Sequence, residues 1–341
     1  MSLKRQKLTW EILSIGLIFL HRWFPNYVDN KTVFIGALTL AIMKYLKEGY
    51  RGVSLLFFII AIATPLLPHK QKFWAIILSV ALYAFYPVFA YPKPTGRYLV
   101  GFRPYWVYET VNTSIFYPTK SKREDALFMP AKVEFWKRWL DSAKLGGVTL
   151  SSFWTKFKLS YLNFLKLGVQ YRAPIAPASE FPGKKFPVII FSHGLASHQH
   201  AYSLHIKEWA SRGYVVFSVA HDDEICPPSK QFEDFAVRNR DLNLRVKAVR
   251  RVIDFIYDKS VKWDNILQDD EFAIDYSNIS VIGHSYGGAT AITAAIEDDR
   301  ITGSCVALDP WMFPIDEKTL NKPVNKPLLI IRAVDFEKRN P

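Results

Sequence analysis

The chain has 341 residues, half of them hydrophobic, and a formal net charge of +13. This length accommodates one large α/β domain and a smaller second unit. Its two cysteines exclude a disulfide framework and a cysteine-rich metal centre, and no nucleic-acid recognition motif accompanies the basic charge, so we expect neither a metal site nor a nucleic-acid partner.

Residues 1–92 hold most of the apolar excess. Four apolar segments lie there: Leu8–Phe24, Thr32–Leu46, Val53–Leu67 and Phe73–Tyr91. The fourth is long enough to cross a hydrocarbon core about 30 Å thick, whereas the second and third are short for it. Because three more such segments would not follow a single cleaved signal peptide, we expect a membrane region of three or four helices; the alternative is a set of buried helices.

The basic residues bear on how such a region would be oriented. Lysines and arginines cluster beside the apolar segments, which favours an anionic membrane surface as a partner, although a basic soluble surface explains the charge equally well. Their distribution over the loops weakly favours a cytoplasmic amino terminus. We therefore expect a multi-pass membrane protein whose larger domain, residues 93–341, lies in the cytoplasm.

From residue 93 onward, strand and helix patterns alternate. Val111–Tyr117 predicts an edge strand, and Phe186–Phe191 is the continuous apolar run of a buried parallel strand. The alternation continues to a last strand at Leu328–Ile331, and repeated βα units predict a parallel sheet covered by helices on both faces. In between, Lys132–Leu167 interleaves aromatic residues with lysine, which suits either a lid or an ordinary helix packed on the sheet.

The segment Asn278–Gly288 carries the clearest chemical signal. A short β-branched run meets Gly283-His284-Ser285-Tyr286-Gly287, and a helix-forming run follows at once. A serine on such a strand–turn–helix is held in a strained backbone with its hydroxyl above the sheet, and the flanking glycines allow the close approach of neighbouring backbone. Ser285 is therefore the candidate nucleophile; the alternative is a glycine-rich turn without chemistry.

Other strand ends supply the remaining groups of an acyl-transfer site. Asp309 directly follows the next strand, so it is the candidate acid that orients the base, ahead of three acids that end no strand: Asp316, Glu317 and Asp335. A developing oxyanion needs two backbone N–H donors. We expect these from Tyr286, the residue after the nucleophile, and from Leu195, in the loop after an earlier strand.

The chain has no histidine after Asp309, because all eight of its histidines precede that residue. Hydrolases of this kind present serine, acid and histidine in that chain order. His284 lies inside the turn itself, and we expect a structural role for it. The domain 93–341 is therefore predicted to stop before the last strand and the catalytic histidine, and losing one member of such a triad costs on the order of a millionfold in turnover.

Several of these segments together resemble a known family, the platelet-activating factor acetylhydrolases, which are calcium-independent phospholipases A2. The matching segments are Pro94–Gly96, Phe186–Leu195, Arg238–Asn239, Ile282–Thr290 and Ala307–Pro314. The resemblance implies an α/β hydrolase that removes a short or oxidised acyl group from the middle carbon of a glycerophospholipid without metal or cofactor. It implies Ser285 as nucleophile, Asp309 as acid, and the amides of Leu195 and Tyr286 as oxyanion hole.

Two features depart from the family pattern, namely the absent histidine and the apolar amino-terminal region. Three hypotheses follow. The first is a serine esterase acting on phospholipid at a membrane, the second a catalytically inactive hydrolase fold serving as a membrane scaffold, and the third an incomplete gene product that lacks the base. The sequence carries no signal for the preferred acyl length or for the oligomeric state.

Overall fold

The computed structural model describes most of the chain in a set of separate ranges. These are residues 4–5, 9–48, 52–85, 89–90, 92–123, 125–127, 166–181, 183, 185–195, 197–221, 234–269 and 271–334. The predicted lid or helix of Lys132–Leu167 falls almost wholly outside them. The chain divides into two compact units, one built mainly from Met1–Pro92 and the other beginning at Lys93, and each is described by itself.

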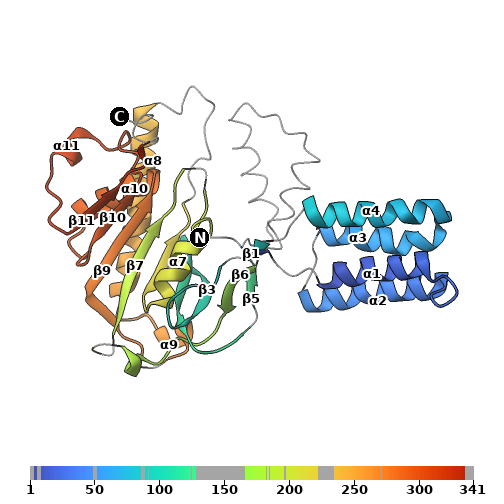
Figure 1. The fold of residues 1–341 in the computed structure, drawn as a ribbon. Coiled ribbons are helices and arrows are strands. Elements are labelled where there is room, and N and C mark those ends of the chain that lie inside the picture. The colour runs from blue at the N-terminus through green and yellow to red at the C-terminus, as the bar shows by residue number, and fades with distance from the viewer. Residues whose placement is uncertain are drawn as a thin grey trace. The chain divides into compact units, whose positions relative to one another are not determined.

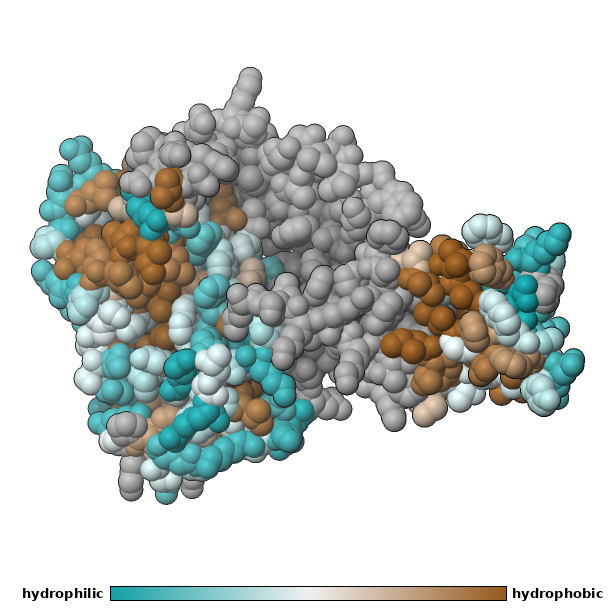
Figure 2. Space-filling model, in the orientation of Figure 1, coloured by the Kyte–Doolittle hydropathy of each residue, from teal (hydrophilic) through white to brown (hydrophobic). Residues whose placement is uncertain are grey.

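The first unit is a bundle of four helices (Figure 1). They are α1 (Thr9–Trp23), α2 (Asn30–Glu48), α3 (Gly52–Ala63) and α4 (His69–Phe85), with a short 3-10 turn, Thr64–Leu66, and a two-stranded pair, β1 (Lys4–Arg5) and β2 (Phe89–Ala90). The centre of the bundle is small and built from Ile18, Ala37, Ala61 and Ile76. Large apolar side chains also lie on its outer surface (Figure 2). Trp74 of α4, for example, is 65% exposed.

The prediction of a multi-pass membrane protein is wrong. Helices α1, α3 and α4 have 15, 12 and 17 residues, which at about 1.5 Å per residue is less than a hydrocarbon core of about 30 Å. Helix α2 is longer but carries Lys31, Lys44, Lys47 and Glu48. Among the described residues, no helix combines enough length with enough apolar character to cross a membrane. The predicted orientation and the predicted cytoplasmic location of the larger domain assumed membrane-spanning helices, so they are no longer supported.

The apolar segment Phe73–Tyr91 shows why its length was misleading. Helix α4 begins earlier than this segment, at His69, so that it includes the charged Lys70 and Lys72, and it ends at Phe85. Pro87 follows two residues later, and a proline lacks the N–H of a helix interior and disfavours helical backbone in the residue before it. The apolar segment in the sequence is therefore longer than the apolar part of helix α4.

The second unit is built on a nine-stranded mixed sheet in the order β11-β10-β9-β7-β8-β4-β3-β6-β5 (Figure 1). The strands are β3 (Leu99–Val107), β4 (Val111–Thr119), β5 (Asp125–Leu127), β6 (Lys166–Tyr171), β7 (Phe186–Ser192), β8 (Val215–Val219), β9 (Ile274–His284), β10 (Cys305–Leu308) and β11 (Leu328–Ile331). The five strands from β11 to β8 are parallel, as predicted. Strand β4 runs antiparallel to both its neighbours, β8 and β3, and so lies inside the sheet, not at its edge as predicted.

Helices cover both faces of this sheet. The helices of this unit are α7 (Ser203–Ser211), α8 (Phe235–Tyr257), α9 (Trp263–Leu267), α10 (Tyr286–Glu297) and α11 (Glu317–Leu320), and α7, α8 and α10 pack on the strands. Two successive residues of β7 show the two layers: Ile190 belongs to the main core with Leu242 of α8, whereas Phe191 packs against Trp209 of α7. The continuous apolar run of β7 thus reflects burial on both faces. In contrast to β7, the edge strand β11 has all four of its side chains 41–53% exposed.

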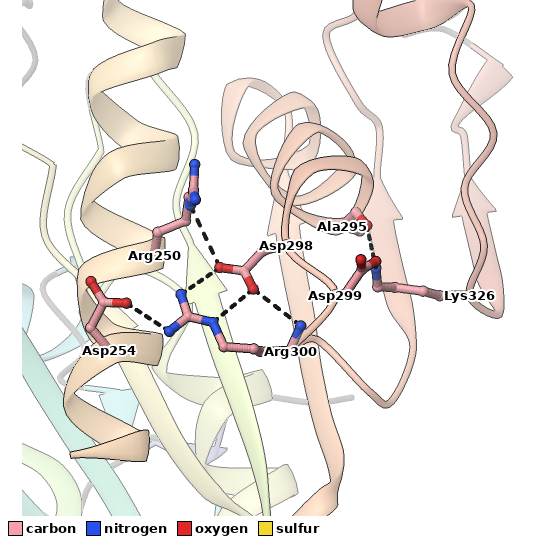
Figure 3. A network of polar contacts seen from close by, with 7 residues as sticks. All are labelled: Arg250, Asp254, Ala295, Asp298, Asp299, Arg300 and Lys326. Carbon is pink, nitrogen blue, oxygen red and sulfur yellow. Dashed lines mark hydrogen bonds and ion pairs between the residues drawn. The ribbon is translucent and has the colours of Figure 1, made fainter.

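A charged network joins the carboxyl end of α10 to α8 (Figure 3). Asp298, only 4% exposed, accepts two hydrogen bonds from the guanidinium of Arg300, at 2.9 and 2.8 Å. Arg300 also donates to Asp254 of α8 at 2.7 Å, and Arg250 of α8 lies 3.5 Å from Asp298. Burial on its own raises the pKa of Asp298, but the hydrogen bonds and charge of Arg300 and the charge of Arg250 outweigh it, so this pKa lies below its ordinary value.

The turn between β9 and α10 depends on glycine because backbone passes close to backbone. A Cβ on Gly283 would lie 1.9 Å from the carbonyl oxygen of Gly287, and a Cβ on Gly287 would lie 2.1 Å from the carbonyl oxygen of Ser192 in β7. Neither contact can be relieved by rotating a side chain. The two glycines therefore let α10 begin directly against the ends of β9 and β7.

We predict that Asp298→Asn lowers the free energy of unfolding by about 1–3 kcal/mol at pH 7, because it weakens charge-assisted hydrogen bonds at a buried site. The pKa of Asp298 is lower in the folded protein than in the unfolded chain. The contribution of Asp298 to stability is therefore fully present above the pKa of the unfolded chain, and it is lost as the pH falls through the pKa of the folded protein. The difference in the free energy of unfolding between Asp298→Asn and the unmodified protein, measured by denaturant titration, should therefore decrease below about pH 4. Asp299→Asn, at a fully exposed neighbour, is the control and should leave the midpoint unchanged.

Gly283→Ala should destabilise the protein by more than about 3 kcal/mol, since the added methyl group meets backbone that cannot rotate away. Gly16→Ala is the matched control: a Cβ there meets nothing within 4 Å, and alanine in a helix is more stable than glycine by about 0.5–1 kcal/mol. Thermal melting followed by circular dichroism measures both. Equal melting temperatures for Gly283→Ala and the unmodified protein would contradict the steric argument.

Candidate active site

Ser285 lies on the turn between β9, which ends at His284, and α10, which begins at Tyr286. Its backbone has φ 53° and ψ −118°, a combination that residues with a side chain rarely adopt. The N–H of Ser285 donates to the carbonyl of Leu308 at 2.9 Å, and its own carbonyl accepts from the N–H of Trp311 at 3.0 Å. The predicted strand, tight turn and helix are therefore present, and the chain after β10 holds the strained residue in place.

Asp309 lies at the same edge of the sheet as Ser285. Strands β9 and β10 are parallel, with Leu308 in register with His284, so the next residue of each strand, Asp309 and Ser285, emerges at the neighbouring carboxyl ends. The N–H of Asp309 donates to Ile331 of β11 at 2.7 Å, and its side chain accepts from the N–H of Ala333. The carboxylate is thus anchored to the segment that follows β11.

The loop after β7 passes close to Ser285. A Cβ on Gly194 would lie 3.5 Å from the Cβ of Ser285, so the peptide that joins Gly194 to Leu195 lies beside the nucleophile candidate. Tyr286 follows Ser285, and its ring is completely buried. All four residues singled out from the sequence, Ser285, Asp309, Leu195 and Tyr286, consequently lie at the carboxyl ends of β7, β9 and β10.

Five histidines at this end of the sheet form hydrogen bonds with groups other than Ser285. Hydrogen bonds join His193 to Gly194 (2.8 Å), His198 to the N–H of His200 (3.1 Å), His200 to Ser114 (2.7 Å), His221 to Ser192 (2.8 Å) and His284 to Tyr202 (2.6 Å). Burial lowers the pKa of His198 to about 3 and that of His221 well below its usual value, so both are neutral at pH 7. Within the described ranges, no histidine is hydrogen bonded to Ser285.

Two arginines of α8, Arg238 and Arg245, are buried, which was not predicted from the sequence. Arg238 is 0% and Arg245 is 1% exposed. Their positions repeat at intervals of three and four with Leu242 and Val249, which places them on the core face of the helix. This spacing in the sequence indicates that both arginines face the core, although arginine side chains are rarely buried.

Among the described residues, no three histidine, cysteine, aspartate or glutamate side chains converge as a candidate ligand set. Cys305 is a free, buried thiol in β10. Burial raises its pKa to about 12, so it stays protonated at neutral pH and is a poor metal ligand.

Known proteins are similar to this chain in fold or in sequence. A ferulic acid esterase from Streptomyces cinnamoneus superposes with a TM-score of 0.51 at 20% identity, over 73% of this chain and 71% of that one, which is a likeness of fold. Platelet-activating factor acetylhydrolases of Cavia porcellus and Canis lupus familiaris are 30% and 28% identical over 73% and 72% of this chain. The chain spans 62% and 60% of the length of these two relatives.

The match to the family extends over most of the second unit. The family described as platelet-activating factor acetylhydrolase, isoform II, matches residues 83–249 and 228–340. These two ranges include the β7 loop, the β9 turn and the end of β10, the three places that hold the candidate residues. The resemblance seen in the sequence is thereby confirmed, and the chain belongs to the platelet-activating factor acetylhydrolase, isoform II, family.

Proposed function

We propose that this protein is a serine esterase that hydrolyses a short or oxidised acyl group from the middle position of glycerophospholipids. The observation that carries the proposal is the common location of Ser285, Asp309 and the Gly194–Leu195 peptide, with Ser285 at φ 53°. The names of the curated relatives, platelet-activating factor acetylhydrolases, support phospholipid as the substrate class.

The reaction would proceed by acyl transfer to Ser285. A base takes the proton from the Ser285 hydroxyl while its oxygen bonds to the ester carbonyl carbon, and the carbonyl oxygen becomes an anion that accepts hydrogen bonds from the amides of Leu195 and Tyr286. Collapse breaks the bond to the glycerol oxygen, which receives the proton from the base. Water, activated by the same base, then releases the fatty acid from the serine, and Asp309 serves throughout to orient the protonated base.

The base is the component that the described residues do not supply to Ser285. Five histidines near this edge make other hydrogen bonds, and burial lowers the pKa of His284 more strongly than the charge of Asp309 raises it. This observation favours a second candidate function, a hydrolase fold that binds lipid without catalysis. The two functions differ in whether the Ser285 hydroxyl is chemically activated.

We expect a fluorophosphonate probe to label the unmodified protein at Ser285, because the strained turn presents the hydroxyl beside two amide donors. Ser285→Ala should abolish the labelling and reduce hydrolysis of a phospholipid with an acetyl group at the middle position to the background rate. Mass spectrometry locates the label, and release of acetate measures hydrolysis. Equal hydrolysis by Ser285→Ala would overturn the esterase assignment, and absence of labelling in the unmodified protein would favour the non-catalytic function.

Added imidazole should raise the Ser285-dependent rate at least about tenfold, because general-base assistance contributes about 10²–10⁴-fold and no histidine among the described residues is hydrogen bonded to Ser285. We expect Asp309→Asn to remove most of this increase, since the carboxylate orients the base. Asp316→Asn is the matched control, because Asp316 caps α11 by accepting from the N–H of Thr319 at 2.8 Å. An equal effect of imidazole on both variants would contradict the role of Asp309.

A further inference from the structure

Helix α8 buries a cation beneath both candidate oxyanion donors. Arg245 is 1% exposed, and a guanidinium with so little access to water requires hydrogen-bond acceptors from the protein. Its Nη1 donates to the carbonyl of His193 at 2.5 Å, and its Nη2 donates to the carbonyl of Gly194 at 3.4 Å. These carbonyls belong to the loop after β7 that passes beside Ser285.

The carbonyl of Gly194 accepts from a second donor as well. Nδ1 of His193 lies 2.8 Å from this oxygen, and since a carbonyl can only accept, Nδ1 carries the proton. The other ring nitrogen, Nε2, accordingly accepts from the backbone N–H of His221 at 3.2 Å. The imidazole of His193 is therefore neutral with a defined tautomer, and the positive charge at this carbonyl comes from Arg245.

One peptide group connects this arrangement to the chemistry. The carbonyl of Gly194 and the N–H of Leu195 belong to the same planar peptide and point in opposite directions, so holding the carbonyl aims the N–H. A cation on the carbonyl oxygen also polarises the peptide and makes its N–H a stronger donor. Arg245 thus acts on Leu195 through a single peptide plane.

The second donor residue contacts the same guanidinium. The Cζ of Arg245 lies 4.4 Å from the centroid of the Tyr286 ring, within the range of a cation–π contact. The hydroxyl of Tyr286 donates to the backbone carbonyl of Arg238, which lies about two helical turns before Arg245 on the same face of α8. The residue whose N–H is the second candidate donor is therefore held against α8 by its own side chain.

We propose that Arg245 is a positioning residue for the oxyanion site, which it sets by holding the Gly194–Leu195 peptide and the Tyr286 ring at once. This inference rests on the proposed esterase function for what the site does, but the positioning itself is a property of the loop. Arg245 acts through these two residues and makes no contact with substrate in the proposed reaction.

Arg245→Met removes the charge and the hydrogen bonds while keeping a side chain of similar length. We expect kcat for acetyl-phospholipid hydrolysis, measured with imidazole present, to fall about 10- to 100-fold with KM within twofold, because the lost interaction acts on the transition state. Hydrogen–deuterium exchange should also speed up in the peptide that covers residues 192–195. Arg251→Met, at an exposed arginine of the same helix, should change neither quantity.

The two measurements separate the possible failures. Unchanged exchange in 192–195, or a loss of activity expressed in KM alone, would overturn the role of Arg245. Faster exchange in a protein that shows no Ser285-dependent hydrolysis would support the positioning and overturn the esterase function instead. If Arg245→Met does not fold, Arg245→Lys, which keeps the charge but lacks the planar fork, is judged by the same two measurements.

Discussion

The contact of backbone against backbone at the β9–α10 turn is the constraint on which the candidate site depends. Gly283 and Gly287 leave no room for a Cβ, so α10 begins directly against the ends of β7 and β9. Ser285 between them is forced to φ 53°, a conformation that costs about 1–3 kcal/mol and persists only where the surroundings hold it. Hydrogen bonds to Leu308 and from Trp311 hold Ser285 in this conformation, which ties the serine to β10, the strand that Asp309 directly follows.

Helix α8 supports the site from a second direction. Toward its carboxyl-terminal half, Arg250 and Asp254 join it to Asp298 and Arg300, beyond the far end of α10. Nearer its amino terminus, Arg245 contacts the loop after β7 and the ring of Tyr286. The same rigid helix is therefore fastened to both ends of α10. A site of this kind needs its donors held to about 0.5 Å, which elements packed on a sheet provide better than loops alone.

Local sequence was a good guide wherever neighbouring residues decide the conformation. The β-branched run before Gly283 forms β9, and the helix-forming run after Tyr286 forms α10. The continuous apolar run Phe186–Phe191 forms β7, a strand that is buried on both faces of the sheet. Local sequence did not predict which elements lie next to one another. Strand β4 was expected at an edge but lies between β8 and β3, because the β3–β4 hairpin joins the parallel strands through an antiparallel pair. Apolar length likewise predicted membrane spans that the described helices do not have.

By itself, the sequence determined the order of strands and helices around Ser285, the location of Asp309 at a strand end and membership of the acetylhydrolase family, because these depend on short contiguous segments. Only the tertiary structure decided which distant groups meet. It turned Arg245 inward against the Gly194 carbonyl and the Tyr286 ring, and it paired five histidines with partners other than Ser285. The physical reason is that burial and hydrogen bonding of a polar side chain depend on residues far along the chain, which no local pattern encodes.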